Sequence, residues 1–72
     1  MANNKMFNLD SIGRNIKLAR QANGFTREQF AELTNVSTRM VYNWEEGLNQ
    51  PTLERYVLIC SVLGKSMDSI AQ

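Results

Sequence analysis

The sequence predicts an all-α fold, a bundle of five short helices. In five segments, apolar residues recur every three or four positions, and each segment opens with a capping residue such as Ser or Thr. No segment alternates polar and apolar residues for long enough to form a sheet. A chain of 72 residues is sufficient for one domain whose helices share a small core.

The first predicted helix begins at Asp10 or Ser11, either of which can cap it, and stops at Gly24. Its inner stripe is expected to carry Ile12, Ile16, Ala19 and Asn23. We expect residues 1–8 to be a frayed lead-in and residues 9–72 to form the domain.

A second helix is predicted to start after Thr26 and to end near Thr34. Gln29 lies three residues after Thr26, which is the spacing of a capping box. Phe25 and Phe30 flank the cap at the positions of a hydrophobic staple. The inner face of this helix is expected to carry Phe30, Ala31 and Leu33.

A tight turn and a third helix follow. Asn35 suits the turn because Asn tolerates a left-handed backbone, and Ser37 can cap a helix that runs to about Glu46. The predicted inner side carries Val41 and Trp44, and the outer side carries Thr38, Arg39, Tyr42 and Asn43. Two short capped helices joined in this way over residues 26–46 predict a helix-turn-helix.

Two more helices complete the pattern. Pro51 prevents the third helix from continuing, and Thr52 caps a fourth. Its expected core stripe is Leu53, Tyr56, Ile59, Cys60 and Leu63. Ser66 caps a last short helix, from which Met67 and Ile70 are expected to pack back on the bundle.

Composition excludes several function classes. With no His and only Cys60, the chain offers no disulfide, no evident metal or cofactor site and no Cys/His nucleophile, so we expect no enzyme and no small-molecule ligand. No apolar run could span a membrane, and the first eight residues lack a signal-peptide pattern, which predicts a cytoplasmic protein. A net charge of +1 is low for a nucleic-acid binder, so any basic surface must be local.

Several motifs together resemble the lambda-repressor-like, Xre-type helix-turn-helix family. They are IGRNIKLAR, TREQFAELTNVS, WEEG with its downstream Pro51, and LERYVLICSVLGKSMDSI. The resemblance covers about residues 12–70 and implies a five-helix bundle that binds double-stranded DNA, usually as a dimer. It also implies that Arg20 pairs with Glu45 and fixes the third helix, the recognition helix of the family. The alternative is two separate surface charges.

The resemblance also implies which residues touch DNA. The base-reading candidates are Thr38, Arg39, Met40 and Asn43. The phosphate candidates are Arg27, Ser37, Tyr42, Asn49, Gln50 and Thr52. Arg can bond bidentately to guanine and Asn to adenine, which suits Arg39 and Asn43. Both could instead be plain surface residues, Tyr42 could lie over the neighbouring loop, and Arg27 could be an ordinary first-turn residue.

The chain departs from the family pattern in its charge. Leu48 stands where the family prefers a basic residue, and the recognition helix carries Arg39 against Glu45 and Glu46. We therefore expect a monomer to bind DNA weakly and two half-sites to be needed for useful affinity.

One apolar pair predicts a partner surface. Leu58 and Val62 lie four residues apart on the fourth helix, on the flank away from its core stripe. With Ile70 they could form an exposed strip that joins two copies in a homodimer, with the two recognition helices about one DNA turn apart. The alternative is that these residues enlarge the core or lie singly exposed.

The resulting functional hypothesis is a sequence-specific DNA-binding transcriptional regulator, most simply a repressor of the prophage or mobile-element type. The alternative is a protein-interaction module on the same scaffold, such as an antitoxin-like or accessory protein with weak DNA binding. Low net charge and Leu48 favour the alternative slightly. A steep fall of DNA affinity with salt would separate the two.

Overall fold

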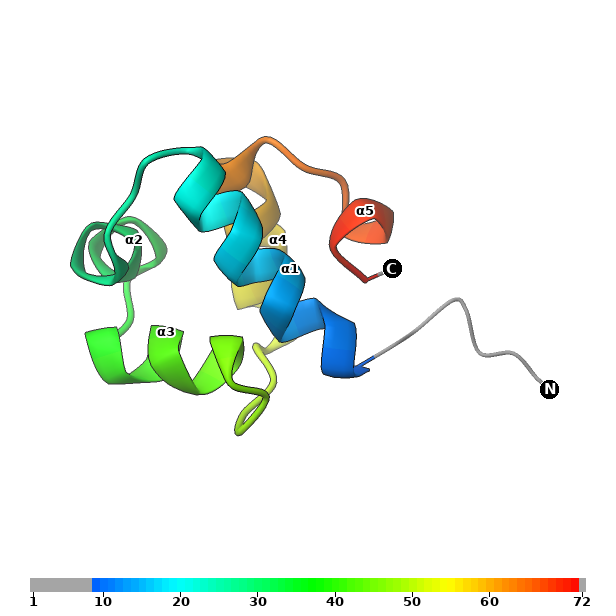
Figure 1. Ribbon diagram of the computed structural model, residues 1–72, viewed down its shortest axis with the longest axis horizontal. Helices are drawn as coiled ribbons and strands as arrows, with labels where there is room; N and C mark the ends of the chain where they lie inside the picture. Colours follow the sequence, from blue (N-terminus) through cyan, green and yellow to red (C-terminus); the bar gives the residue numbers. More distant parts are fainter. Residues whose placement is uncertain (1–8, 72) are drawn as a thin grey trace, which may run out of the picture.

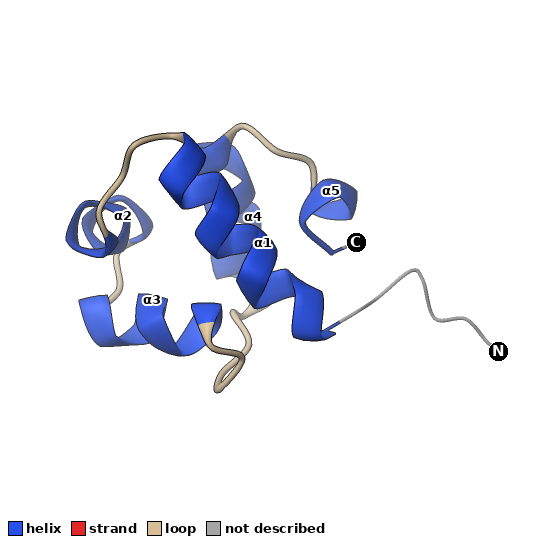
Figure 2. Cartoon of the chain, in the orientation of Figure 1, coloured by secondary structure: helices blue, strands red, loops and turns tan. Residues whose placement is uncertain are grey.

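The structure, a computed structural model, describes residues 9–71. Over these residues the chain forms α1 (Leu9–Ala22), α2 (Arg27–Thr34), α3 (Thr38–Glu45), α4 (Leu53–Leu63) and α5 (Met67–Ala71). Helix α1 crosses the middle of the bundle, with α2 and α3 on one side, α5 on the other and α4 behind it (Figure 1). All regular structure in the described range is helical (Figure 2). The predicted all-α five-helix fold is confirmed, whereas the predicted lead-in at 1–8 lies outside the described residues.

The start of α2 has the predicted capping geometry. The Thr26 hydroxyl oxygen accepts a hydrogen bond from the Gln29 backbone N–H at 3.0 Å, and the Gln29 side-chain oxygen accepts one from the Thr26 N–H at 2.8 Å. The rings of Phe25 and Phe30 lie 6.3 Å apart between centroids, as expected for a hydrophobic staple. Local sequence alone therefore determines where this helix begins.

The turn between α2 and α3 is also as predicted. Asn35 adopts a left-handed backbone, with φ of 59° and ψ of 46°, and it is the non-glycine residue with positive φ among those described. Ser37 caps α3 by accepting a hydrogen bond from the Met40 backbone N–H at 3.1 Å. These two residues fix the direction in which α3 leaves α2.

Each helix contributes one fully buried aliphatic or aromatic residue to the centre of the core. The exposed fraction is 2% or less for Ile16, Phe30, Val41, Ile59 and Ile70. Trp44 and Cys60 are buried as predicted, and burial raises the pKa of the Cys60 thiol. Among residues 9–71 no helix has the length and apolarity needed to cross a membrane.

Three apolar residues predicted to lie in the core are exposed instead: Leu33, Leu53 and Met67, at 48%, 69% and 38%. In α2, Thr34 is buried in place of Leu33. Its hydroxyl donates to the Phe30 carbonyl at 2.8 Å, so a polar side chain can enter the core with its donor satisfied. Leu53 and Met67 are the first residues of α4 and α5, and the buried positions of each helix begin only later along the chain.

The boundaries of α1 also differ from the prediction. The helix begins at Leu9, so Asp10 and Ser11 lie in its first turn rather than at its cap. Acidic residues are favourable in a first turn as well as at a cap, so the sequence pattern does not separate the two. Asn23 is exposed rather than on the inner stripe, because it follows the helix and its side-chain N–H₂ donates to the Ala19 carbonyl at 2.8 Å.

Polar contacts attach α5 to the bundle. The Asn15 side-chain N–H₂ donates to the Ile70 carbonyl at 2.7 Å, and the Tyr56 hydroxyl donates to the Met67 carbonyl at 2.9 Å. Partial burial raises the pKa of Tyr56, and Cys60 and Asp68 raise it further. Ile70 fills the core, so its predicted packing on the bundle is confirmed and its alternative place in an exposed dimer strip is wrong.

Helices α1 and α3 cross at Gly13 with almost no space between their backbones. A Cβ atom added at Gly13 would lie 2.3 Å from the Trp44 carbonyl oxygen and 2.9 Å from that of Glu45. Both neighbours are backbone atoms, which cannot move aside as a flexible side chain could. The absence of a side chain at this position therefore sets how closely α3 approaches α1.

We expect Gly13→Ala to lower the free energy of unfolding by about 1–3 kcal/mol, because overpacking against backbone outweighs the better helix propensity of Ala. Thermal unfolding followed by circular dichroism measures the change. Gln21→Ala, on an exposed position of the same helix, is the matched control and should shift stability by no more than about 0.5 kcal/mol. Equal or higher stability of Gly13→Ala would contradict the close crossing.

Candidate nucleic-acid interface

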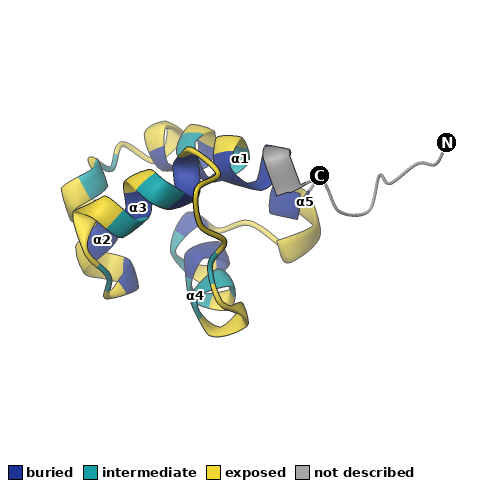
Figure 3. Cartoon of the chain, turned by 90° about the horizontal axis from the view of Figure 1, so that it is seen from below, coloured by how far each residue is buried: buried dark blue, intermediate teal, exposed yellow. Residues whose placement is uncertain are grey.

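Helix α3 presents one side to solvent at the edge of the molecule. Its inner side is occupied by Val41, Trp44 and Glu45, all of which are buried. Thr38, Arg39 and Tyr42 are exposed, and Asn43 is half-buried. Seen from below, the loop that leads from α3 to α4 is largely exposed, and exposed and half-buried residues lie along α3 (Figure 3). The polar side chains of α3 lie where they can meet a large ligand.

A buried carboxylate holds the end of α3 in place. The Glu45 side chain is 0% exposed, and its two oxygens accept hydrogen bonds from Arg20 Nε at 2.6 Å and Arg20 Nη2 at 3.2 Å. Arg20 Nη1 also donates to the Phe25 carbonyl at 2.7 Å. This bidentate geometry is the strong form of an ion pair. The Arg20–Glu45 pair that the resemblance implied is therefore present, between α1 and α3.

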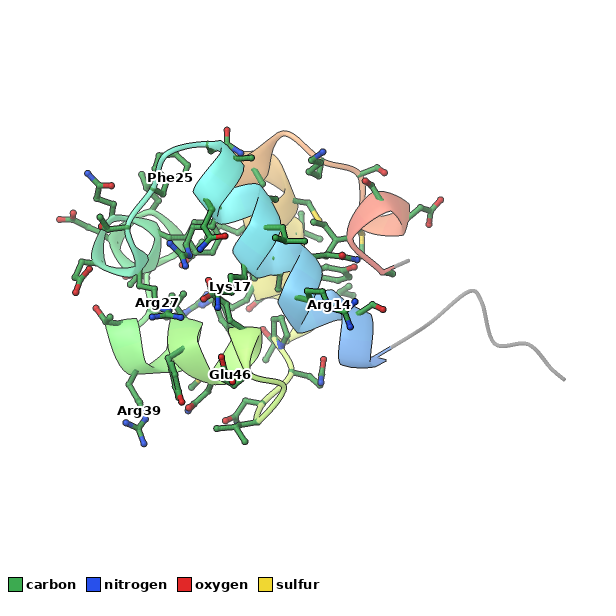
Figure 4. The ribbon with its side chains drawn as sticks, viewed as in Figure 1. Arg14, Lys17, Phe25, Arg27, Arg39 and Glu46 are labelled. Atoms are coloured by element: carbon green, nitrogen blue, oxygen red, sulfur yellow. The ribbon has the colours of Figure 1, made fainter. Side chains whose placement is uncertain are left out.

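Arg27 is a second partner of the same carboxylate, which the sequence reasoning missed. Its Nε donates to Glu45 Oε1 at 2.9 Å, and its side chain is 33% exposed. Figure 4 shows Arg27 between α2 and α3. A guanidinium has five N–H donors, so this bond leaves others that can face an incoming anion. No spacing rule relates positions 27 and 45, so only the packing of α2 on α3 reveals the contact.

Arg27 also contacts Tyr42. The Cζ atom of Arg27 lies 5.4 Å from the centroid of the Tyr42 ring, and that of Arg39 lies 5.7 Å from the same centroid. Both distances are within the range of cation–π interactions. Figure 4 shows the Arg39 side chain extending away from the body of the bundle. Two cationic side chains from different helices thus share one aromatic ring.

An open hollow lies beside this ring, between α2 and the first turn of α3. Its lining residues are Arg20, Arg27, Glu28, Thr38, Arg39 and Tyr42. Three guanidinium groups and one carboxylate therefore border the hollow, and Glu45 beneath is already bonded to two of the guanidinium groups. Around the hollow, the arginines outnumber the Glu28 and Glu45 carboxylates by one, so the positive charge there is local and modest.

A second hollow lies on the other flank of α3, toward α4. Asn49, Gln50 and Thr52 line it, and all three are exposed. Thr52 also caps α4 by accepting a hydrogen bond from the Arg55 backbone N–H at 3.2 Å. Met40 lines the same hollow, is half-buried and packs against the core, so it is less available to a base edge than the exposed Thr38 and Arg39.

A hydrogen bond from α4 also holds the turn of the helix-turn-helix. Arg55 Nη2 donates to the Asn35 carbonyl at 3.4 Å. The sequence analysis assigned no role to Arg55. Its partner is a backbone carbonyl, which every residue has, so the sequence cannot predict the contact. Within residues 9–71, His, Cys, Asp and Glu side chains do not gather in groups of three or more that could hold a metal ion.

Comparison with known proteins decides the family. The helix-turn-helix family profile matches residues 16–70, most of the chain. The chain belongs to the helix-turn-helix family of the lambda-repressor-like, Xre type. Members of this family are transcriptional regulators rather than enzymes. This agrees with the resemblance that the sequence motifs indicated.

Two curated relatives are uncharacterised helix-turn-helix-type transcriptional regulators of Rickettsia conorii and Rickettsia prowazekii. Each is 33% identical to this helix-turn-helix protein over 57 residues, which is 79% of this chain. The aligned region covers 46% and 44% of the two relatives. The chain thus spans somewhat less than half the length of the curated relatives it matches.

Solved structures have the same fold. The clp gene regulator ClgR of Corynebacterium glutamicum superposes with a TM-score of 0.78 at 24% identity, over 86% of this chain and 80% of that one. The restriction-modification controller protein C.AhdI of Aeromonas hydrophila gives 0.79 at 21% identity, over 86% and 94%. At these identities the likeness establishes the fold of this helix-turn-helix protein.

Removing the buried carboxylate tests the central ion pair. We expect Glu45→Ala to lower the free energy of unfolding by about 3–5 kcal/mol, because Arg20 would remain buried without its partner. Urea unfolding followed by Trp44 fluorescence and circular dichroism measures the loss. Glu46→Ala, which removes an exposed carboxylate from the next position, is the control and should change stability by about 0.5 kcal/mol or less. Equal stability of the two variants would show that the pair does not hold α3.

Proposed function

We propose that this helix-turn-helix protein is a sequence-specific regulator of transcription that binds double-stranded DNA with α3 in the major groove. The observation that carries the proposal is the exposed polar side of α3, which the buried Glu45 contacts hold at a fixed orientation to α1 and α2. The major groove of DNA accommodates one α-helix, and its base edges are distinguishable there. We propose that the protein occupies a promoter and blocks polymerase, as a repressor of the prophage or mobile-element type.

The proposed contacts divide into two groups. Base edges would be read by Thr38, Arg39 and Asn43, with Met40 contributing from its half-buried position. Phosphates would be bound on both flanks of α3, by Arg27, Ser37 and Tyr42 on the α2 side and by Asn49, Gln50 and Thr52 on the α4 side. The two hollows beside α3 support this division, because each lies along one flank of the same exposed helix.

Selection from a random double-stranded DNA pool at low salt tests the proposal. We expect an enriched inverted repeat whose half-sites are separated by about one DNA turn. Recovery of unrelated sequences would overturn sequence-specific binding. Measuring the affinity for the selected site at several salt concentrations then counts the phosphate contacts, since affinity falls linearly with salt on a logarithmic scale.

Replacing the exposed arginine of α3 tests the assignment of base contacts. We expect Arg39→Ala to weaken binding to the selected site by about 1–3 kcal/mol and to relax the base preference at one position. Lys65→Ala removes the same charge from the segment that joins α4 to α5 and should leave the base preference unchanged. Loss of the same size in both variants would mean that Arg39 acts only through net charge.

We also propose that two copies associate through the outer face of α4. Exposed apolar side chains on this helix are Leu53 and Val57, four residues apart, and Leu58 beside them is half-buried. Val62 packs against the core and is therefore left out of the proposed strip. The strip that we propose consists of Leu53, Val57 and Leu58. Homodimerisation through this face would place two α3 helices on one inverted repeat.

Sedimentation equilibrium tests the dimer. We expect a dimer at micromolar concentrations for the unmodified protein and a monomer for Val57→Lys, because a charge would be buried in an apolar contact. Leu18→Lys, at another exposed apolar position on α1, is the matched control and should remain dimeric. A monomeric unmodified protein at high micromolar concentration would contradict the proposal.

A second candidate function is a protein-interaction module on the same scaffold. Leu48 is 66% exposed in the loop that follows α3, at the edge of the proposed DNA surface. An antitoxin-like or accessory protein would use such apolar residues to hold another protein. Failure to bind DNA even at low salt, together with retained folding, would favour this candidate.

A further inference from the structure

The Tyr42 ring lies where the two cationic side chains of the DNA surface meet. Arg27 from α2 and Arg39 from the first turn of α3 each place their guanidinium carbon within 6 Å of its centroid, at 5.4 and 5.7 Å. Arg39 and Tyr42 are three residues apart on α3, a spacing that puts side chains on the same side of a helix. We call these three residues the arginine–tyrosine stack.

One end of the stack is anchored inside the protein. The Arg27 Nε atom donates to the Glu45 carboxylate, which is fully buried and is also held by Arg20. Arg27 is therefore restrained before any ligand arrives, and its contact with the ring restrains Tyr42 in turn. The ring is the contact that the structure describes for the exposed Arg39, so Tyr42 links Arg39 to the restrained Arg27.

We propose that Tyr42 is a positioning residue for DNA readout, whose ring orders Arg27 toward a phosphate and Arg39 toward a base edge before binding. The inference deepens the proposed function and depends on it. A mobile arginine side chain loses conformational entropy when it binds a base, and that entropic cost weakens binding. A ring that holds the guanidinium group in place removes part of the loss in advance.

Two substitutions separate the ring from its hydroxyl. We expect Tyr42→Leu to bind the selected DNA roughly 2- to 12-fold more weakly, the factor that corresponds to ordering one long side chain during binding. Its preference at the base contacted by Arg39 should relax. Tyr42→Phe keeps the ring and loses only the hydroxyl that would contact a phosphate, so it should bind more tightly than Tyr42→Leu and keep the base preference of the unmodified protein. Leu18→Ala shortens an exposed side chain on α1 and serves as the control for surface truncation.

A measurement without DNA tests the geometry separately. In proton NMR spectra of the free protein, we expect side-chain protons of Arg27 and Arg39 to be shifted upfield by the Tyr42 ring. The shifts should persist in Tyr42→Phe and disappear in Tyr42→Leu, while the dispersion of the core signals stays the same. Arginine shifts that are identical in Tyr42→Leu and the unmodified protein would overturn the stack.

The outcomes distinguish this inference from the function on which it depends. Random recovery from the DNA pool would overturn the proposed function, whatever the NMR spectra show. Specific binding by the unmodified protein with equal affinity and base preference in Tyr42→Leu would overturn the positioning role alone. Equal losses in Tyr42→Phe and Tyr42→Leu would also overturn it, because the hydroxyl and not the ring would then be the group that matters.

Discussion

The Glu45 carboxylate is the group on which the arrangement of the first three helices depends. It lies on α3, is fully removed from solvent, and receives hydrogen bonds from Arg20 of α1 and Arg27 of α2. A buried charge without partners is strongly destabilising, so this carboxylate is tolerated only when all three helices are in place. The same requirement disfavours packings in which α3 is rotated or shifted. The ion pairs thus select one arrangement, even though their net contribution to stability can be small.

The exposed side of α3 is a consequence of what fills its inner side. Val41 and Trp44 pack into the core, Glu45 is bonded to arginines, and the backbone meets α1 at Gly13 with no side chain between them. The inner side of α3 is therefore fully packed, and the side chains on its other side face solvent. The cationic groups on this surface are Arg27 and Arg39, and the buried Glu45 carboxylate restrains Arg27.

Helix α4 carries two exposed apolar residues in addition to its core stripe. Ile59, Cys60 and Leu63 supply the core, yet Leu53 and Val57 are exposed. Helices with apolar residues on several sides are usually covered on several sides. This supports a partner on the outer face, whereas the polar side of α3 supports DNA. The two surfaces belong to different helices, so one protein could engage both at once.

The sequence by itself determined the five helices and their limits, except the start of α1. Capping residues such as Thr26, Ser37 and Thr52, and the left-handed Asn35, act within a few residues, so their effects can be predicted from local spacing. The motifs also determined the family, and with it the Arg20–Glu45 pair. The periodicity of apolar residues predicted burial less well. In helices of eight to eleven residues the row of apolar side chains is short, and the neighbouring helices decide which of these side chains are covered.

Tertiary structure decided what depends on distance between elements. Thr34 is buried and Leu33 beside it is exposed because of how α2 packs on its neighbours, which no local pattern contains. The close crossing brings Gly13 against Trp44 and Glu45, which are 31 and 32 positions later in the chain. The bond from Arg27 to Glu45 joins residues 18 positions apart. Such contacts form only after the helices pack, since each needs two backbones at a fixed separation. Local sequence therefore specified the helices of this protein, and the packing around the buried Glu45 carboxylate specified which side of α3 is exposed.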